Sequence, residues 1–375
     1  MTITNAKIVL ENKVIENGYV VIKDGKILEI GEGKYQGNDM VFDAKGNVLM
    51  PGFIDIHVHG SCGIDFMDAN ADDYKIISES MYKEGVTTFM ATTLTSDHES
   101  LLKVCENVKE AKKVAKNLGG IHFEGPYINA NHKGAQNEAF IRNPNIDELK
   151  QYIEKSGNNV RYISLAPEKE GAMEFIKFAR ENGVSCSAGH TDATFDDVEK
   201  AIKNGLTNTT HTHNAMSGHH HRKPGVVTAA MYFDELFTEC ICDGIHVCPN
   251  TIRTFYKIVG ADRFIIITDA LKIKHSDINE FQLFGLDCVR QNGAAYLTSG
   301  PLAGSLLTLD QGVRNIQEWT GASLIELAKI SSRNAARSLR LNDRGEIKVG
   351  LLADFVLLDE KLNVLNVFKE GNKVL

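Results

Sequence analysis

Histidines and carboxylates recur at the ends of apolar segments along this sequence. They are His57 and His59, Glu124, His190, His211 and His213, Asp243 and His246, and Asp269. Imidazole and carboxylate groups are ligands suited to Zn, Fe, Mn or Co. Residues at i and i+2 of a strand share a face, so His57 and His59 can point the same way. Any one of them could be a hydrogen-bonded histidine or a helix-capping carboxylate, but their common placement favours a hydrolytic metal site.

The segments that end in these residues have the pattern of short buried strands. There are eight, at residues 52–60, 86–93, 119–125, 160–168, 183–190, 207–214, 238–247 and 264–270. Stretches of helical period lie between them, for example residues 72–85, 99–117, 172–183 and 194–205. This alternation predicts a (β/α)8 barrel, TIM-like, over residues 52–340. Catalytic residues of such barrels gather where the strands end.

The two ends of the chain have a different sequence pattern from the barrel region. Residues 1–51 show short strands broken by turns, with Asp24-Gly25 as a hairpin turn, and residues 341–375 return to the same pattern. We therefore expect both ends to pair into one small β-sandwich domain. The barrel would then be an insertion within that domain.

Composition excludes several classes of protein. The 375 residues include 41 Lys+Arg and 49 Asp+Glu, a net charge of −8, which offers no surface for nucleic acid or an anionic membrane. No apolar run reaches the roughly 18 residues that cross a bilayer, and no signal peptide is evident, so we expect a cytoplasmic protein. Seven scattered cysteines favour reduced, buried thiols over disulfides. Any anionic ligand must be held by a local cluster of cations.

Several longer motifs carry a family resemblance. PGFIDIHVHG, HFEGPYIN, AGHTDAT, THTHNAM, DGIHV, TDA and PLAGSLLTL occur in this order. The chain thereby resembles the N-acetylglucosamine-6-phosphate deacetylases of the amidohydrolase superfamily over nearly its whole length. The H-x-H pair with a distant Asp is typical of the superfamily, whereas HFEGP, THTHNAM and LAGS are much narrower.

The resemblance implies a set of metal ligands. Glu124, His190 and His211 would hold one divalent ion, and His57 and His59 would complete a second site, with Glu124 as the bridge and Asp269 shared. One or two ions per subunit are expected, Zn or Fe first, with Mn, Co and Ni as further candidates.

The resemblance also implies roles in substrate binding and catalysis. Asp269 matches the catalytic carboxylate, His246 a contact to sugar hydroxyls, and Asn214, Ala215 and Arg222 contacts to a phosphate; Gln136, Leu302 and Ala303 complete the substrate-binding set. Gln136 stands where some family members have a substrate-contacting histidine. The family arrangement also implies a homodimer in which Arg222 can reach a neighbouring subunit's site.

The implied reaction explains why these residue types are needed. An unstrained amide resists hydrolysis, and a divalent ion lowers the pKa of water from about 15.7 towards 7 while polarising the carbonyl. Asp269 could take the proton from water and return it to the leaving amine. We therefore expect hydrolysis of N-acetylglucosamine 6-phosphate, an amino-sugar phosphate, to glucosamine 6-phosphate and acetate, in amino-sugar catabolism.

Two other classes of protein remain as alternatives. A cyclic-amide or N-acyl amino acid hydrolase would usually place a metal-bridging Lys on the fourth strand, but residues 160–168 contain none and Lys169 lies just past them. A non-catalytic scaffold would be expected to lose ligands or the catalytic Asp, and all are present. The run His219-His220-His221 is interpreted as a solvated loop, and His122 as a structural neighbour of the site.

Overall fold

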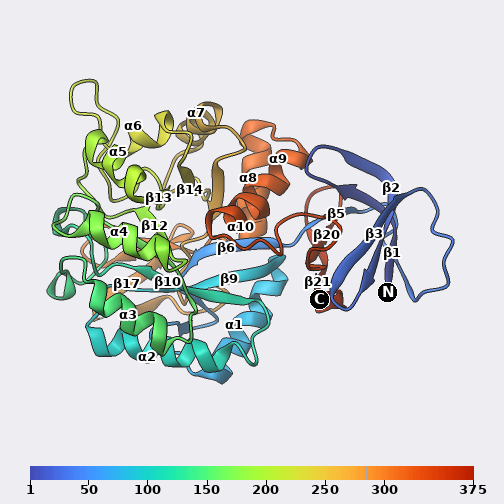
Figure 1. Ribbon diagram of the computed structural model, residues 1–375, viewed down its shortest axis with the longest axis horizontal. Coiled ribbons are helices and arrows are strands. Elements are labelled where there is room, and N and C mark those ends of the chain that lie inside the picture. Colours follow the sequence, from blue (N-terminus) through green and yellow to red (C-terminus); the bar gives the residue numbers. More distant parts are fainter. Residues whose placement is uncertain (284) are drawn as a thin grey trace.

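Eight parallel strands form a closed barrel in the computed structural model, which describes residues 1–283 and 285–375 (Figure 1). The strands are β6 (Phe53–Val58), β9 (Val86–Thr93), β10 (Leu118–Glu124), β11 (Val160–Leu165), β12 (Ser185–Ala188), β13 (Leu206–Thr209), β14 (Phe237–Ile241) and β15 (Phe264–Ile267). They pair in chain order, and a parallel bridge between Val58 and Ala270 closes the ring. Each strand overlaps one of the eight expected segments, so the predicted barrel is confirmed.

Helices surround the barrel and follow the strands. They are α1 (Ala71–Lys83), α2 (His98–Ala111), α3 (Ile146–Lys155), α4 (Ala172–Glu181), α5 (Phe195–Asn204), α6 (Val226–Tyr232), α7 (Pro249–Val259), α8 (Leu309–Thr320), α9 (Leu324–Ala328) and α10 (Asn334–Ser338), with the short turns η1 (Ala130–His132), η2 (Glu138–Phe140) and η3 (Lys329–Arg333). Helix α5 shows why they begin and end where they do. Thr194 and Asp197 form a reciprocal capping box, and Gly205, at φ +114°, ends the helix in a conformation that favours glycine.

A second sheet is built from both ends of the chain. Its strands are β1 (Thr2–Val9), β2 (Val14–Lys23), β3 (Lys26–Glu32), β4 (Val41–Asp43), β5 (Val48–Pro51), β20 (Phe355–Leu358), β21 (Val364–Lys369) and β22 (Asn372–Lys373). The order is β22-β21-β20-β5-β1-β2-β3, with β4 on β1, and the N- and C-termini lie near each other at this end of the molecule (Figure 1). Strand β20 runs antiparallel to β5, which joins the two ends as expected.

The small sheet is mixed rather than purely antiparallel, because β1 pairs in parallel with β4 and β5. The Asp24-Gly25 turn between β2 and β3 is present, and both residues have positive φ, as a tight hairpin requires. The division of the chain at residues 51/52 and 340/341 stays a prediction.

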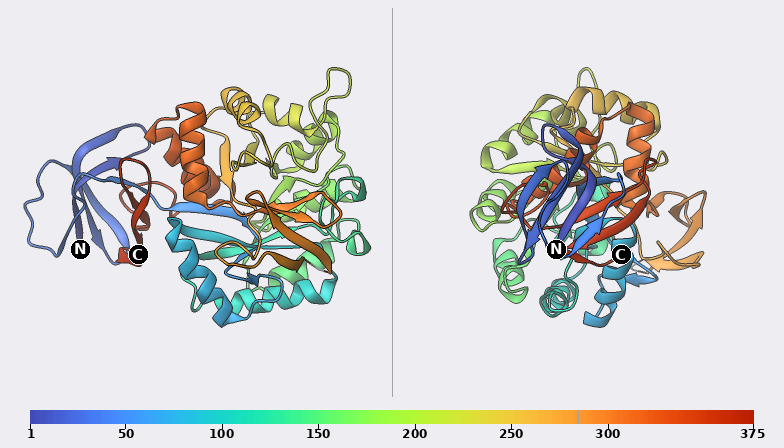
Figure 2. Two further views of the ribbon diagram at one scale, coloured as in Figure 1. Left: turned by 180° about the vertical axis from the view of Figure 1, so that it is seen from behind. Right: turned by 90° about the vertical axis from the view of Figure 1, so that its right-hand side faces the viewer.

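An antiparallel sheet follows the last barrel strand, which the sequence patterns did not indicate. It consists of β16 (Glu280–Leu283), β17 (Leu286–Gln291), β18 (Ala294–Leu297) and β19 (Leu302–Ser305). Figure 2 shows it in orange against the side of the barrel. The Ser305 N–H donates to the Asp269 carbonyl at 3.0 Å, so this sheet is tied to the end of β15. A small hairpin, β7 (Gly60–Ser61) and β8 (Ile64–Asp65), follows β6.

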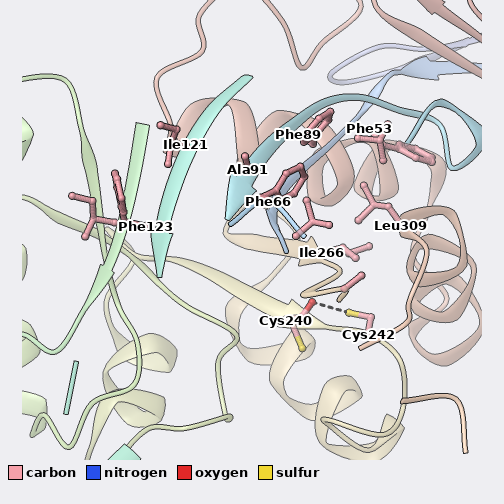
Figure 3. Close-up of a cluster of buried hydrophobic side chains, with 14 of the residues drawn as sticks. Phe53, Phe66, Phe89, Ala91, Ile121, Phe123, Cys240, Cys242, Ile266 and Leu309 are labelled. Atoms are coloured by element: carbon pink, nitrogen blue, oxygen red, sulfur yellow. Dashed lines mark hydrogen bonds between the residues drawn. The ribbon is translucent and has the colours of Figure 1, made fainter. Parts of the chain in front are cut away.

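The main hydrophobic core lies between the barrel strands and the surrounding helices (Figure 3). Phe53, Phe66 and Phe89 are fully buried there. The rings of Phe66 and Phe89 stack with their centroids 5.7 Å apart. All seven cysteines are free thiols, and Cys240 and Cys242 are among the five that are buried, as expected. No helix within residues 1–283 and 285–375 has both the length and the apolar character that a membrane crossing requires.

Candidate active site

Three candidate metal-ligand side chains, which follow three different strands, meet at the C-terminal mouth of the barrel. Glu124 is the last residue of β10, and His190 and His211 each lie two residues past the end of β12 and β13. The Nε2 atoms of His190 and His211 lie 3.1 and 3.0 Å from Glu124 Oε1, and 3.1 Å from each other. All three side chains are buried. This group can hold a metal ion.

A second group adjoins the first. His57, near the end of β6, His59 just past it and Asp269, two residues after β15, bring their ligand atoms within 4.8 Å of one another. His57 Nε2 and His59 Nε2 lie 3.4 and 3.2 Å from Asp269 Oδ1. Glu124 contacts both histidines at 3.3 Å, through Oε1 to His57 and Oε2 to His59. Its carboxylate therefore joins the two groups, as a bridging ligand would.

The backbone at three of these residues adopts an energetically unfavourable conformation. His190, His211 and Asp269 have φ values of +49°, +30° and +49°, in the left-handed region that residues other than glycine rarely adopt. Such strain persists where the surrounding structure imposes it, which is common at functional sites. The Nδ1–H of His190 donates to the His132 carbonyl at 2.8 Å, which leaves the Nε2 lone pair directed at Glu124.

The donor set fits a divalent cation. The Nε2 atom of His57, which faces Glu124 and Asp269, is buried and makes no hydrogen bond among the described residues. A bound divalent cation would give this nitrogen a partner, since imidazole and carboxylate groups are usual ligands of such cations. The two groups together could hold two ions.

Both carboxylates favour the ionised form that a metal requires. Burial alone would raise the pKa of Asp269, but the nearby His57 and His59 outweigh it and lower that pKa below its usual value. Burial likewise opposes ionisation of Glu124, and His57 and His190 hold its pKa well below the usual range. A neutral acid at either position is thereby disfavoured.

A cavity of about 320 Å³ opens above the two groups. Its wall includes the ligand residues His59, Glu124, His190, His211 and Asp269, and the predicted substrate-binding residues Gln136, Asn214, Ala215, His246, Leu302 and Ala303. His57 is completely buried and is not part of this wall. The cavity has the size of a pocket for one small molecule.

Arg222 is the one predicted substrate-binding residue that the structure places outside this cavity. It lies exposed on the loop between β13 and α6, which projects from the barrel (Figure 1), and its Nη1 donates to His221 Nε2 at 2.8 Å. The run His219–His221 is exposed on the same loop, in agreement with the expected solvated loop.

His246 is oriented by a carboxylate. Asp243 Oδ2 lies 2.6 Å from His246 Nδ1, and Asp243 Oδ1 also accepts the His246 backbone N–H at 2.8 Å. Burial would lower the pKa of His246, but the contact with Asp243 outweighs it and raises that pKa. The ring can thus present a donor to a ligand in the cavity.

Two further histidines, His122 and His213, have other surroundings. His122 is fully buried, and its ring nitrogens lie within hydrogen-bonding distance of two hydroxyl groups, Thr92 Oγ1 at 3.2 Å and Ser164 Oγ at 2.8 Å. The ring of His213 packs edge-on against Phe255. Neither residue belongs to the two ligand groups.

Glu239 was missed by the sequence reasoning. Located in β14 and fully buried, it accepts hydrogen bonds from the Tyr162 hydroxyl and the His211 N–H, and its Oε2 lies 3.5 Å from His57 Nδ1. A carboxylate behind a ligating histidine orients the ring and raises its basicity. The signal was a single charged residue inside an otherwise uncharged strand, TECIC.

The loop after β10 contributes further residues that had no predicted role. Asn131, His132, Gly134 and Ala135 line the cavity beside Gln136. They fall in the irregular segment NANHKGAQ, where no periodicity marks which side chains face inward.

A barrel with histidine and carboxylate ligands at its strand ends is the arrangement of a metal-dependent hydrolase. The amidohydrolase family matches residues 48–374, and the chain belongs to this family. Within it, the chain is 39% identical to the N-acetylglucosamine-6-phosphate deacetylase of Lysinibacillus sphaericus, over 94% of this chain and 92% of the relative. It is 35% identical to that of Bacillus subtilis, over 99% and 96%.

A solved structure agrees with these relatives. It is a mutant N-acetyl-D-glucosamine-6-phosphate deacetylase from Mycobacterium smegmatis in complex with N-acetyl-D-glucosamine-6-phosphate. The TM-score is 0.94 at 29% identity, covering 100% of this chain and 99% of the other. The chain therefore groups with the deacetylases among the amidohydrolases.

Proposed function

We propose that this chain hydrolyses the acetamide of N-acetylglucosamine 6-phosphate to glucosamine 6-phosphate and acetate. The observation that carries the proposal is the joint position of Glu124 and Asp269, two ionised carboxylates that share histidine partners at the floor of one small cavity. The relatives at 35% and 39% identity supply the substrate.

Divalent metal ions complete the proposed centre. Glu124, His190 and His211 would hold one ion, and His57, His59 and Asp269 the other, with Glu124 between them. Zn or Fe is the first choice, and Mn, Co and Ni have compatible chemistry. When bound, a divalent ion lowers the pKa of water and polarises the amide carbonyl.

The side chains of the chain then have separate tasks. The Asp269 carboxylate accepts a proton from the attacking water and delivers it to the amine nitrogen as the C–N bond breaks. His246, held by Asp243, donates to a sugar hydroxyl. Asn214 and Ala215 line the cavity beside His211 and provide amide donors for the phosphate.

We further propose that the phosphate contact of Arg222 is made in a homodimer. Arg222 lies outside the cavity of its own chain, on a projecting loop. Such a loop can reach the cavity of a second copy, in line with the family arrangement. The chain's net charge of −8 makes short-range donors necessary for a dianionic substrate.

Acetate release tests the proposed activity. The purified chain, loaded with each candidate metal and analysed for metal content, is incubated with N-acetylglucosamine 6-phosphate. Unphosphorylated N-acetylglucosamine and N-acetylgalactosamine 6-phosphate are the comparison substrates. We expect rapid release from the first substrate and slow release from N-acetylglucosamine. No release from N-acetylglucosamine 6-phosphate by metal-saturated protein would refute the proposal.

A further inference from the structure

A second cavity, of about 610 Å³, lies at the opposite end of the barrel from the candidate active site. Its wall is formed where α2 leads into β10, at the start of β11, and in the segment between α10 and β20. Glu370, in the turn after β21, adds the small sheet to this wall. The N-terminal ends of the barrel strands face the small sheet (Figure 1), and the residues that line the cavity come from both parts.

Cations outnumber anions on the wall of this cavity. The cations are Lys112, Lys116, Arg161, Arg340 and Arg344, and the anions are Asp343 and Glu370. Asp343 is already neutralised, because Arg344 donates to its two oxygens from Nε at 2.8 Å and from Nη2 at 3.0 Å. Positive charge is thus in excess, in a chain whose overall charge is −8.

The remaining cations have few partners. Arg161 has a buried Nε that makes no hydrogen bond among the described residues. Lys112 Nζ donates to a neutral acceptor, the Gly119 carbonyl, at 3.2 Å. Arg340 Nη1 likewise donates to the Arg180 carbonyl at 3.2 Å.

The unbalanced charge affects Lys112 directly. Burial, followed by repulsion from Arg161, Arg344 and Lys369, lowers the pKa of Lys112 to about 8. Partly buried cations that repel one another destabilise the fold unless a counter-anion is present. The cavity therefore has the charge of an anion-binding site.

We propose that this cavity binds a small phosphorylated metabolite, with its phosphate between Arg161 and Lys112. A guanidinium and an ammonium group are the usual donors to a phosphate dianion. The volume suits a molecule of sugar-phosphate size, because small-molecule pockets are roughly 300–1,000 Å³. The site is independent of the proposed deacetylase activity, since it shares no residue with the candidate active site.

Ligand binding here would add to the contacts that join the segments of the cavity wall. Arg344 donates to Thr88 in β9 at 3.0 Å and lies in the segment that leads to β20. A phosphate held by Arg161 and Lys112 would likewise join β11 to the segment that leads from α2 to β10. The bound anion would therefore stabilise the folded chain.

Calorimetric titration of the full chain tests this proposal. The probes are ribose 5-phosphate and inorganic phosphate, with ribose as the neutral control, in phosphate-free buffer at fixed salt. The variants are Arg161→Gln and Lys112→Gln. The matched control is Lys109→Gln, in the last turn of α2 just before Lys112, because Lys109 does not line the cavity. Binding that both cavity variants retain at the wild-type affinity is assigned to the active site.

We expect ribose 5-phosphate to bind the wild type and Lys109→Gln alike, and each cavity variant at least about tenfold more weakly. Ribose itself should not bind. Equal affinity for inorganic phosphate would identify the free anion as the ligand, whereas tighter binding of ribose 5-phosphate would identify a phosphate ester.

Thermal unfolding gives an independent readout, and it also shows whether each variant is folded. Without phosphate, Arg161→Gln should unfold at the same temperature as the wild type or higher, because it removes repulsion. Added phosphate should raise the Tm of the wild type but not of Arg161→Gln. Unchanged affinity in both cavity variants, or an equal Tm rise in wild type and variant, would overturn the proposal.

Discussion

The side-chain amide of Gln136 donates a hydrogen bond to Glu124 Oε2 at 2.6 Å. The same amide accepts the Thr95 backbone N–H at 2.7 Å through its Oε1, so both of its ends are fixed. Gln136 thus restrains the carboxylate that joins the two ligand groups, in addition to lining the cavity. Its neighbours in the loop after β10 make no such contact with Glu124.

Replacing Gln136 by Ala should weaken metal binding. Residues that hydrogen-bond to a ligating carboxylate typically contribute about 10- to 100-fold in metal affinity. We expect a loss in that range, measured by competition with a chelator of known affinity. Asn131→Ala, which alters another residue of the cavity wall, is the matched control and should bind metal normally. Equal affinity in Gln136→Ala and wild type would show that Glu124 needs no restraint.

Removing ligands should separate the two metal sites. His190→Ala takes one of three ligands from the first group, so metal content and activity should fall together. His59→Asn affects the second group and should lower the content by about one ion per chain, with partial activity retained. Elemental analysis of protein dialysed against each metal gives the count. An unchanged count in His59→Asn would mean that the second group holds no ion.

The Asp269→Asn variant tests proton transfer. The amide keeps the shape of the carboxylate but cannot accept a proton, so kcat should fall by about 10²- to 10⁴-fold. Substrate binding, measured by calorimetry with N-acetylglucosamine 6-phosphate, should persist. A loss confined to KM would contradict the catalytic role, and the metal content must be measured in parallel because Asp269 is also a candidate ligand.

Arg222→Ala should affect only the phosphorylated substrate. A charge-assisted contact contributes roughly 1.5–3 kcal/mol, so KM for N-acetylglucosamine 6-phosphate should rise about 10- to 150-fold. Activity on N-acetylglucosamine should scarcely change. Equal losses on both substrates would remove Arg222 from the phosphate contact.

Hybrid dimers locate the Arg222 contact. When Asp269→Asn chains are mixed with Arg222→Ala chains, one cavity in each hybrid combines an intact Asp269 with the other chain's Arg222. Recovery of low-KM activity is expected for a contact across the interface. Failure to recover, in a mixture shown to exchange subunits, would place the contact within one chain.

Glu84 forms a buried ion pair that stabilises the folded chain. Its Oε1 lies 2.6 Å from Lys274 Nζ and 2.7 Å from His275 Nε2, and Glu84 and Lys274 are each about 1% exposed. Glu84→Gln removes the carboxylate that contacts the buried Lys274 charge, which should cost about 3–5 kcal/mol in the free energy of unfolding. Denaturant titration measures this loss. Replacing both partners with apolar residues should cost less than the sum of the single changes.

The same pair predicts a pH dependence. Burial would raise the pKa of Glu84, but Lys274 and His275 outweigh it, so the folded pKa lies below the usual value. The stabilisation is therefore complete above the unfolded value of about 4.3 and is lost as the pH falls through the lower folded value. The difference between wild type and Glu84→Gln should shrink over that acidic range. A difference independent of pH would contradict the assignment.

The sequence by itself was sufficient to predict the barrel and the meeting of its candidate metal ligands at one mouth. The eight apolar segments alternate with helical periods, and parallel strands place all their C-terminal ends at one mouth. Residues such as His57, Glu124 and Asp269, which end different segments, must then lie near one another. Local pattern and topology thus determine which groups meet, before any side-chain contact is known.

Tertiary structure alone decided how the groups interact. Glu124 touches both histidine groups, and Glu239 lies behind His57, because side chains from non-adjacent strands meet across the barrel, where sequence spacing carries no information. The antiparallel strands of residues 280–305 are only four to six residues long, so they leave no clear periodic signal. The position of Arg222 outside its own cavity depends on the path of a loop, which no local pattern fixes.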